Sequence, residues 1–199
     1  VGKNIGTSLD SFKRKGYKVD VVESLKGSVD LSTYNSVFVL GLLEQLDNSE
    51  EFLIQCRYLL TTQPKTRFIF STKNVAFFAL RMLLSFGLFN YGERGILTVN
   101  TKRLFTLSSF RRMLRETGYT PGRVVGLGLP FRLLFGGFMG RFFSRTSDFF
   151  ARIWPSAFGY QFLIEAKAKP HAFSILQTAE KFYDIQPTPT KTQEAQTSV

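Results

Sequence analysis

Two short runs of continuous apolar residues, each followed by a helical pattern, constrain the fold of this chain most strongly. Residues 35–40 contain SVFVL and residues 67–72 read RFIFST, and these aromatic and β-branched side chains suit buried strands. Helical patterns follow over residues 47–60 and 75–88. Strands that alternate with helices indicate an α/β fold, a sheet with helices on both faces.

The rest of the chain alternates in the same way. Helical patterns cover residues 7–15 and 108–117, and a glycine ends each, because glycine readily adopts the left-handed conformation after a helix. Strand patterns cover KVDVVE at residues 18–23, RVVGLGL at residues 123–129 and YQFLIEAK at residues 160–167. The sequence therefore predicts further strands of the same sheet.

The length and composition allow one domain with its own core. The chain has 199 residues, 44% of them hydrophobic, and a mean hydropathy of −0.02. We assign residues 1–169 to this domain and expect a helical insertion at about residues 131–155, before the last strand. A C-terminal helix is expected over residues 170–185. Residues 186–199 are polar and rich in proline and threonine, which predicts a disordered tail.

The charge of the chain restricts its partners. A net charge of +11 and a pI of about 10.0 indicate attraction to anionic surfaces, either nucleic acid or an acidic membrane leaflet. The sequence contains no RNP-like aromatic signature, zinc knuckle or helix-turn-helix pattern. A membrane surface is therefore favoured over nucleic acid.

Cysteine and histidine usage limits the chemistry further. Cys56 is the single cysteine, which excludes an internal disulfide and a cysteine metal cluster and fits a reducing compartment. Its place in the helical pattern of residues 47–60 suits a small core residue better than a nucleophile. His171 is the single histidine, so a multi-histidine metal site is excluded and no metal is expected. No signal peptide is visible, and we expect a cytoplasmic protein.

An ordered series of short motifs runs through the middle of the chain: STKNVA at residues 71–76, FNY at 89–91, RGIL at 94–97, RLFT at 103–106 and SFRR at 109–112. This series resembles a group of bacterial class I S-adenosylmethionine-dependent methyltransferases that often occur beside or fused to glycosyltransferases. That group reads roughly S-T-P-N-V-A, then F-x-Y-x-x-R-G-I-L-D-x-T-H-x-R-x-F-T, then S-F-R-R-L-L. The family's Pro, Asp, Thr and His are replaced here by Lys73, Thr98, Asn100 and Thr101.

The resemblance implies a Rossmann-like class I methyltransferase sheet and S-adenosylmethionine as the cofactor. In this family the last two strands form an antiparallel pair, and insertions between them are common. The first residues, VGKNIG, are similar to the family's V-G-C-G-x-G loop, so we expect a truncated first strand. Gly2 and Gly6 are the implied cofactor-binding glycines, while Asn4 replaces the middle glycine. A plain strand–helix turn is the alternative interpretation of this segment.

Three acidic residues are further candidates for cofactor binding. Glu23 ends the predicted strand over residues 18–23, where a carboxylate can accept two hydrogen bonds from a ribose diol; the alternative is an ordinary exposed acid. Asp30 is the acid available in the short interval that follows, on the adenine side. Glu44 lies in GLLEQL, which resembles the family's D-V-L-E-H-L, and Gln45 replaces the histidine.

The resemblance also implies a reaction. It would be methyl transfer from a sulfonium to an oxygen or nitrogen nucleophile, with Glu93 and Arg103 as the candidate catalytic residues and Glu93 near the acceptor. The family's setting suggests a sugar or lipid-linked glycan as the acceptor, and a glycosyltransferase as a partner.

The alternative is a catalytically degenerate methyltransferase-like domain. The replacements at Asn4, Gln45, Lys73, Thr98 and Thr101 all fall at the implied site, while the apolar positions of the fold are kept. Such a domain would serve as a binding or scaffold module, for an attached glycosyltransferase or a membrane surface.

The segment before the last strand is strongly amphipathic. On a helical wheel Arg141, Arg145, Asp148 and Arg152 share one face, and the other face holds Phe142, Phe143, Phe149, Phe150, Ile153 and Trp154. Such a helix can lie at a membrane interface, which predicts a peripheral protein on the inner face of a membrane. The alternative is a helix that packs its aromatic side into the core. A transmembrane span is not expected, because proline, arginine and glycine interrupt the apolar run.

Overall fold

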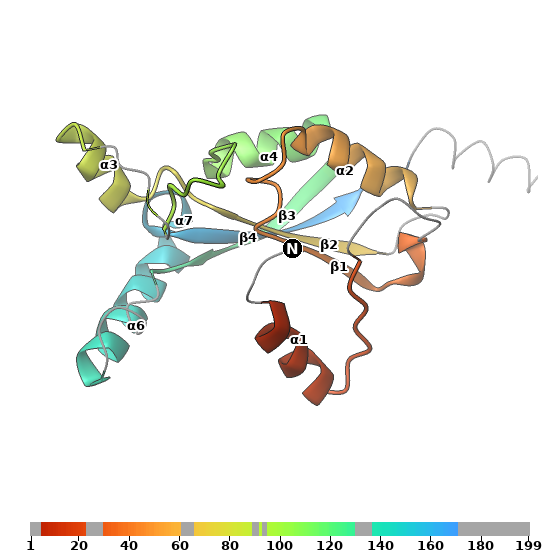
Figure 1. The fold of residues 1–199 in the computed structure, drawn as a ribbon, viewed down its shortest axis with the longest axis horizontal. Helices are drawn as coiled ribbons and strands as arrows, with labels where there is room; N and C mark the ends of the chain where they lie inside the picture. Colours follow the sequence, from red (N-terminus) through yellow and green to blue (C-terminus); the bar gives the residue numbers. More distant parts are fainter. Residues whose placement is uncertain are drawn as a thin grey trace, which may run out of the picture. The chain divides into compact units, whose positions relative to one another are not determined.

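The computed structural model describes residues 5–22, 30–60, 66–88, 92, 95–129 and 137–170 (Figure 1). Its elements in chain order are α1 Ile5–Arg14, η1 Leu31–Thr33, β1 Ser36–Leu40, α2 Ser49–Tyr58, β2 Arg67–Lys73, α3 Phe78–Ser85, α4 Leu107–Glu116, β3 Tyr119–Leu127, α6 Gly137–Ile153, α7 Pro155–Phe158 and β4 Gln161–Ala168. All of them belong to one unit, Val1–Lys169; of the second unit, Pro170–Val199, only Pro170 is described. The predicted C-terminal helix and tail therefore lie outside the described residues.

The four strands form one mixed sheet in the order β1-β2-β4-β3. β1 and β2 are parallel, with Leu40 opposite Ser71, and β4 runs antiparallel to both β2 and β3. The last strand of the sheet thus lies between two earlier ones. The sheet confirms the predicted α/β class, and the β3–β4 pair is antiparallel as the resemblance implied. The helices α6 and α7 occupy the place of the helical insertion predicted before the last strand.

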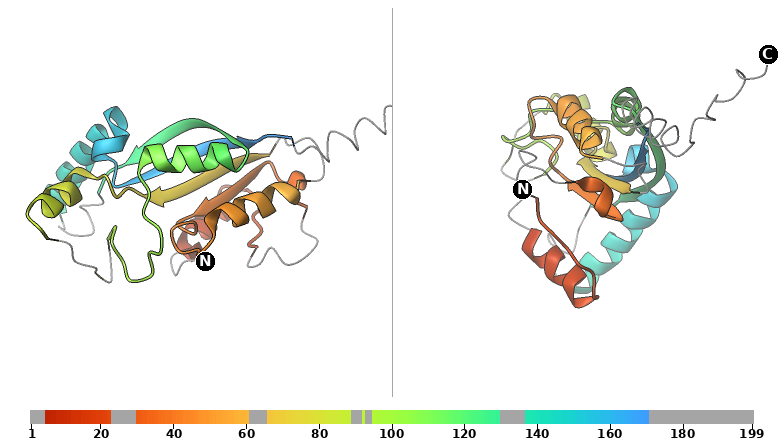
Figure 2. Two further views of the ribbon diagram at one scale, coloured as in Figure 1. Left: turned by 90° about the horizontal axis from the view of Figure 1, so that it is seen from above. Right: turned by 90° about the vertical axis from the view of Figure 1, so that its right-hand side faces the viewer.

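Two helices with clear end signals, α2 and α4, lie on the same side of the sheet (Figures 1 and 2). The Asn48 side chain accepts a hydrogen bond from Glu51 N and caps α2, which has two glutamates in its first turn. Thr106 and Ser109 form a capping box at the start of α4. On the other side of the sheet lie α1 and α6, and the Phe12 ring of α1 is 5.6 Å from the Phe38 ring of β1.

The core lies between the sheet and the pair α2–α4, and it is rich in aromatic rings. Its fully buried side chains include Phe68, Phe70, Phe110, Tyr119 and Phe162. The Tyr119 ring contacts the rings of Phe68 and Phe70, and its hydroxyl donates to Leu53 O at 2.9 Å. Burial raises the pKa of the Cys56 thiol to about 12, so this residue is the core cysteine that the sequence predicts.

The strand predicted over residues 18–23 is wrong for its described part. Residues 17–22 run as an irregular, largely exposed segment, and Glu23 lies outside the described residues. A β pattern forms a strand only where a neighbour supplies partners for its backbone N–H and C=O groups. Within the described ranges, residues 17–22 pair with no strand of the sheet.

Candidate functional site

The carboxyl ends of β1 and β2 lie side by side, because these strands are parallel and Leu40 is in register with Ser71. The loop at residues 41–46 follows β1 and contains Glu44, and β2 ends at Lys73 with Asn74 directly after it. In open α/β sheets, ligands bind outside the carboxyl ends of the strands. This edge of the sheet is therefore the candidate site.

Glu44 is the central residue of this edge. It is 3% exposed, and its carboxylate accepts hydrogen bonds from Thr72 Oγ1 at 3.1 Å and from Lys73 N at 3.0 Å. The Lys73 ammonium also lies 3.1 Å from Glu44 Oε1. A carboxylate this deeply buried needs such partners, since an unpaired buried charge costs several kcal/mol. Glu44 thus fastens the loop after β1 to the end of β2.

The same residue also holds the arm that precedes α4. The Glu44 carbonyl oxygen accepts hydrogen bonds from Lys102 N at 2.8 Å and Arg103 N at 3.1 Å. The Arg103 guanidinium donates to the Glu50 carboxylate and lies 5.4 Å from the centre of the Phe105 ring. The hydrogen bond from Arg103 lowers the pKa of Glu50. Both the backbone and the side chain of Arg103 are therefore fixed by hydrogen bonds.

Asn74 ties the site to the region before β4. Its side chain is fully buried, donates to Gly159 O at 2.8 Å and Ser156 O at 3.0 Å, and accepts from Ala76 N at 3.0 Å. Its backbone N–H donates to Tyr160 O at 3.0 Å. The sequence marked Asn74 only as part of a motif. Its structural role could not be predicted, because its partners lie some eighty residues later in the chain.

Apolar side chains and one hydroxyl, that of Tyr160, form a wall on the other side of this edge. The Phe77 and Tyr160 rings meet edge to face at 5.8 Å, and a buried cluster of Phe77, Leu80, Ile96 and Leu97 lies behind them. Burial raises the pKa of Tyr160, and the negative charge of Glu44 raises it further. Tyr160 therefore stays a neutral hydrogen-bonding group beside the buried carboxylate, and sequence reasoning missed it.

The arm carries hydroxyls where the resembled family has an acid and an imidazole. Thr98 Oγ1 and Thr101 Oγ1 are 2.7 Å apart and hydrogen-bonded to each other. Neither hydroxyl titrates near neutral pH, so this pair cannot act as a general base.

The structure brings together two of the predicted site residues, Glu44 and Arg103. Asp30 lies before β1, at the opposite end of the sheet, where its carboxylate accepts from Ser32 N at 2.8 Å and caps η1. Gly6 lies in the first turn of α1. The structure does not bring Asp30 to Glu44.

Three predicted site residues, Gly2, Glu23 and Glu93, lie outside the described residues. Across the described ranges, no group of three acidic, cysteine or histidine side chains could hold a metal ion. No helix within these ranges is long and apolar enough to cross a membrane.

No protein-family model and no curated protein matches the sequence. Among solved structures, a SAM-dependent methyltransferase from Thermotoga maritima is similar at 13% identity over 79% of this chain and 67% of that chain, with a TM-score of 0.49. A SAM-dependent methyltransferase from Archaeoglobus fulgidus is similar at 16% identity over 81% of each chain, with a TM-score of 0.49.

Magnesium protoporphyrin IX methyltransferase from Synechocystis, solved with bound SAH, is similar at 14% identity over 68% of this chain and 45% of that chain, with a TM-score of 0.39. With TM-scores this low, none of these likenesses decides the chemistry of the site. The fold assignment depends on the sheet of the chain itself.

Proposed function

We propose that this chain is a methyltransferase-type domain that binds S-adenosylmethionine at the carboxyl ends of β1 and β2. One observation carries the proposal: three segments that lie far apart in the sequence meet at Glu44. These segments are the loop at residues 41–46, the motif at residues 71–76 and the arm at residues 97–106. They are also segments that resemble the class I methyltransferases, so their meeting supports a shared ligand site.

The backbone at this edge fits the close approach of a cofactor. Gly41, the first residue after β1, has a φ of 61°, and a Cβ built on it would meet no atom within 4 Å. The Gly41 N–H donates to Ser71 O at 3.1 Å, so this hydrogen bond fixes the backbone beside the open space. A glycine with this freedom lets a ligand lie directly against the backbone.

The contribution of the chain to catalysis would be positioning. Bound S-adenosylmethionine supplies a methyl group on a positively charged sulfur. Glu44, held by Thr72 and Lys73, fixes the floor of the site, and Arg103, held by Glu50, fixes the arm. Holding donor and acceptor in line can supply several kcal/mol of the barrier reduction without a general base.

We further propose that the acceptor is a sugar or a lipid-linked glycan. Leu80 of α3 packs with Ile96 and Leu97 of the arm, and α3 exposes further apolar side chains beside them. This rim suits an acceptor with a lipid portion. A peripheral position on the inner face of a membrane and a glycosyltransferase partner belong to the same proposal.

A second candidate function is a degenerate domain that serves as a binding or scaffold module. The observation in its favour is that three carboxylates at this edge are paired with cations: Glu44 with Lys73, Asp47 with Lys102 and Glu50 with Arg103. The Thr98 and Thr101 hydroxyls are likewise hydrogen-bonded to each other, so all of these polar groups have partners within the chain. A site of this kind could keep its shape after losing its chemistry.

Calorimetric titration with S-adenosylhomocysteine distinguishes the two candidates. We expect micromolar binding, on the order of −8 kcal/mol. Gly41→Leu should weaken binding at least tenfold. Gly16→Leu is the matched control, since Gly16 also has a positive φ, 81°, and open space around an added Cβ, but it follows α1.

Each outcome has a defined meaning, provided that circular dichroism shows a folded sample. If the wild type does not bind at millimolar ligand, the cofactor proposal is wrong and the scaffold candidate stands. If Gly41→Leu binds as well as Gly16→Leu, the cofactor does not lie at this edge.

A further inference from the structure

A continuous aromatic surface spans the helices α3, α7 and α6. On α3 and just after it, large apolar side chains are exposed to solvent, and among the described residues of this helix only Leu80 is buried: Phe78, Met82, Leu83, Leu84, Phe86 and Leu88 are exposed. Contiguous exposed apolar surface of this kind marks an interaction site in a soluble domain.

The second part of this surface lies on α6, and its direction is fixed by packing. The Asp148 carboxylate accepts from Gly128 N at 3.0 Å, Ser147 Oγ accepts from Leu129 N at 2.9 Å, and Ala151 is buried. These contacts hold one side of α6 to the end of β3. Three large apolar side chains near the C-terminal end of α6 are exposed, and so is the residue directly after the helix: Phe149, Phe150, Ile153 and Trp154.

These contacts correct the helical-wheel prediction for Asp148. They also test the alternative that α6 packs its aromatic side into the core. Asp148, which the wheel groups with Arg141, Arg145 and Arg152, binds the backbone after β3 instead of facing water with them. The aromatic side chains named above are not in the core, so the alternative of a core-packed aromatic face is wrong for them. The Phe142 side chain lies outside the described part of the chain.

The short helix α7 joins the two parts. The Phe158 ring lies 5.3 Å from Phe78 of α3, 5.5 Å from Phe150 of α6 and 6.3 Å from Trp154, measured between ring centres. Phe78 also contacts Phe77, a residue of the wall beside Tyr160. The surface therefore reaches from the C-terminal end of α6, across α7, to the rim of the candidate site, at the end of the sheet where β2 leads into α3 (Figure 1).

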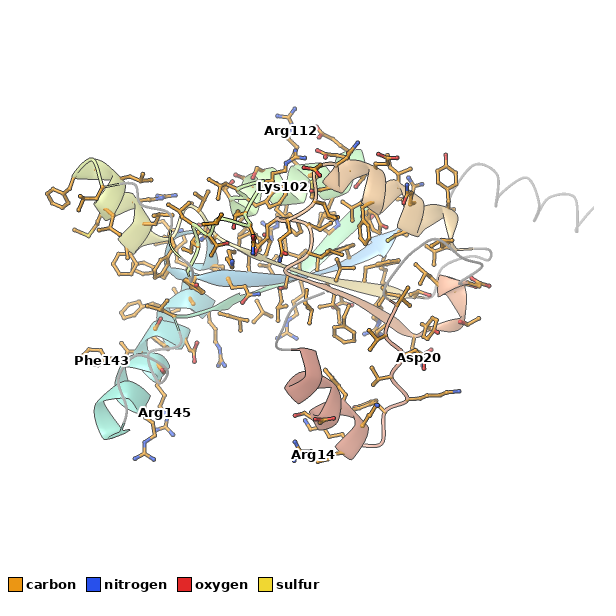
Figure 3. All side chains as sticks on the ribbon, viewed as in Figure 1. Arg14, Asp20, Lys102, Arg112, Phe143 and Arg145 are labelled. Carbon is orange, nitrogen blue, oxygen red and sulfur yellow. The ribbon has the colours of Figure 1, made fainter. Side chains whose placement is uncertain are left out.

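The charge around this surface is of one sign. The exposed charged side chains of α3 and α6 are all arginines: Arg81, Arg141, Arg145 and Arg152. Asp148 is the single acid of these helices, and its carboxylate accepts a hydrogen bond from Gly128 N, directly after β3. Figure 3 shows Arg145 projecting from α6. Two copies of the chain facing each other here would bring like charges together, whereas anionic headgroups would complement them.

We propose that α3, α7 and α6 form a docking surface for an anionic phospholipid membrane. The aromatic and aliphatic side chains enter the boundary of the acyl chains, and the arginines remain at the level of the headgroups, as in interfacial amphipathic helices. This function does not depend on cofactor binding.

The single tryptophan of the chain, Trp154, lies in this surface and reports on the proposal directly. We expect the full chain to sediment with vesicles of phosphatidylcholine containing about one third phosphatidylserine, and its tryptophan emission to shift to the blue. Binding to pure phosphatidylcholine vesicles should be at least tenfold weaker, and added salt should weaken binding to the anionic vesicles.

The double variant Phe86→Glu/Phe149→Glu should lower vesicle affinity at least tenfold. These side chains are 74% and 60% exposed, so their replacement leaves the core intact. The matched control is Tyr17→Glu/Tyr58→Glu, which changes the net charge equally at two aromatic positions, each 61% exposed, outside this surface. The control should bind within about twofold of the wild type.

Three results would overturn the proposal. The wild type could remain in the supernatant with unshifted emission. The control could lose as much affinity as the surface variant, which would reduce the effect to net charge. Vesicle binding could be absent while sedimentation equilibrium shows a dimer that Phe86→Glu/Phe149→Glu dissociates, which would assign the surface to a second copy of the chain.

Discussion

Glu44 links three segments of the candidate site. Its carboxylate binds the end of β2, and its carbonyl oxygen binds the arm before α4. One buried side chain therefore fixes three parts of the sequence. Changes at this position should affect the fold and any bound ligand together.

Replacement of Glu44 by glutamine should lower the free energy of unfolding by about 2–4 kcal/mol, because Lys73 would lose its partner in a largely buried position. Urea unfolding measures the change. Glu116→Gln is the control, since Glu116 forms an exposed pair with Arg112 on α4 and should leave stability nearly unchanged. Equal stability of the two variants would contradict the structural role of Glu44.

The pair Glu50–Arg103 should make stability depend on pH in the acid range. Arg103 lowers the pKa of Glu50 in the folded chain below its ordinary 4.5. The stabilisation is therefore complete above this ordinary pKa and disappears as the pH falls through the lower folded-state pKa. Thermal unfolding below about pH 5 should show a shallower dependence in Glu50→Gln than in the wild type. An identical slope in both proteins would show that the pair is not formed.

Cys56 should be inert while the chain is folded. Its thiol is buried and its pKa is raised to about 12, so almost no thiolate is present near neutral pH. Alkylation by iodoacetamide at about pH 8 should be at least 100-fold slower in buffer than in denaturing urea. Similar rates in the two solutions would mean that α2 does not pack as described.

The contact between α6 and β3 decides which side of α6 faces outward. Glycines of β3 and the loop after it allow this contact, since a Cβ on Gly126 would overlap the Ala151 carbonyl oxygen and one on Gly128 would lie 2.5 Å from Ser147 Oγ. The orientation of the docking surface thus depends on small residues of the strand, outside the helix itself.

Gly126→Ala should therefore lower stability by about 1–3 kcal/mol, because the backbone of α6 must move away from β3. Gly122→Ala on the same strand is the control, since its Cβ would meet Glu165 O at 3.4 Å, near ordinary contact. Differential scanning calorimetry compares the two variants. If Gly122→Ala destabilises the chain as much as Gly126→Ala, close helix packing is not the cause.

The sequence predicted most elements whose signals are local. The helical patterns over residues 47–60 and 108–117 correspond to α2 and α4, and the continuous apolar runs correspond to β1 and β2. The segment at residues 18–22 has an equally good pattern but pairs with no strand of the described sheet. Strand formation requires a neighbour, and a pattern read along one segment does not contain that information.

The candidate site was predicted less completely, for the same reason. Glu44 and Arg103 stood in motifs and were singled out, but the roles of Asn74 and Tyr160 depend on contacts between distant segments. The helical wheel likewise predicted the two faces of α6, but it did not predict the hydrogen bond between Gly128 N and the Asp148 carboxylate. Such contacts depend on tertiary packing, which neither periodicity nor spacing encodes.

At the scale of the whole sheet, protection against exchange should follow strand position. β2 and β4 each have strands on both sides, whereas β1 and β3 lie at the ends of the order β1-β2-β4-β3. α3 buries only Leu80 of its described residues, while α4 buries Phe110, Met113 and Leu114. Stability is therefore uneven across the chain.

Hydrogen–deuterium exchange followed by mass spectrometry should show the slowest exchange in β2 and β4 and faster exchange in α3 than in α4. Equal protection of α3 and α4 would indicate that another molecule covers α3 in solution. Added anionic vesicles should slow exchange in α3 and α6 and leave α2 unchanged.

The strand order also governs how this chain can mature on a ribosome. β4, which ends at Ala168, separates β2 from β3, so these two earlier strands have no direct partner in each other. Phe68 and Phe70 of β2 can be covered fully only after the last strand of the sheet has been synthesised. A nascent chain of this design leaves its most aromatic strand without one of its two neighbours until β4 has been synthesised.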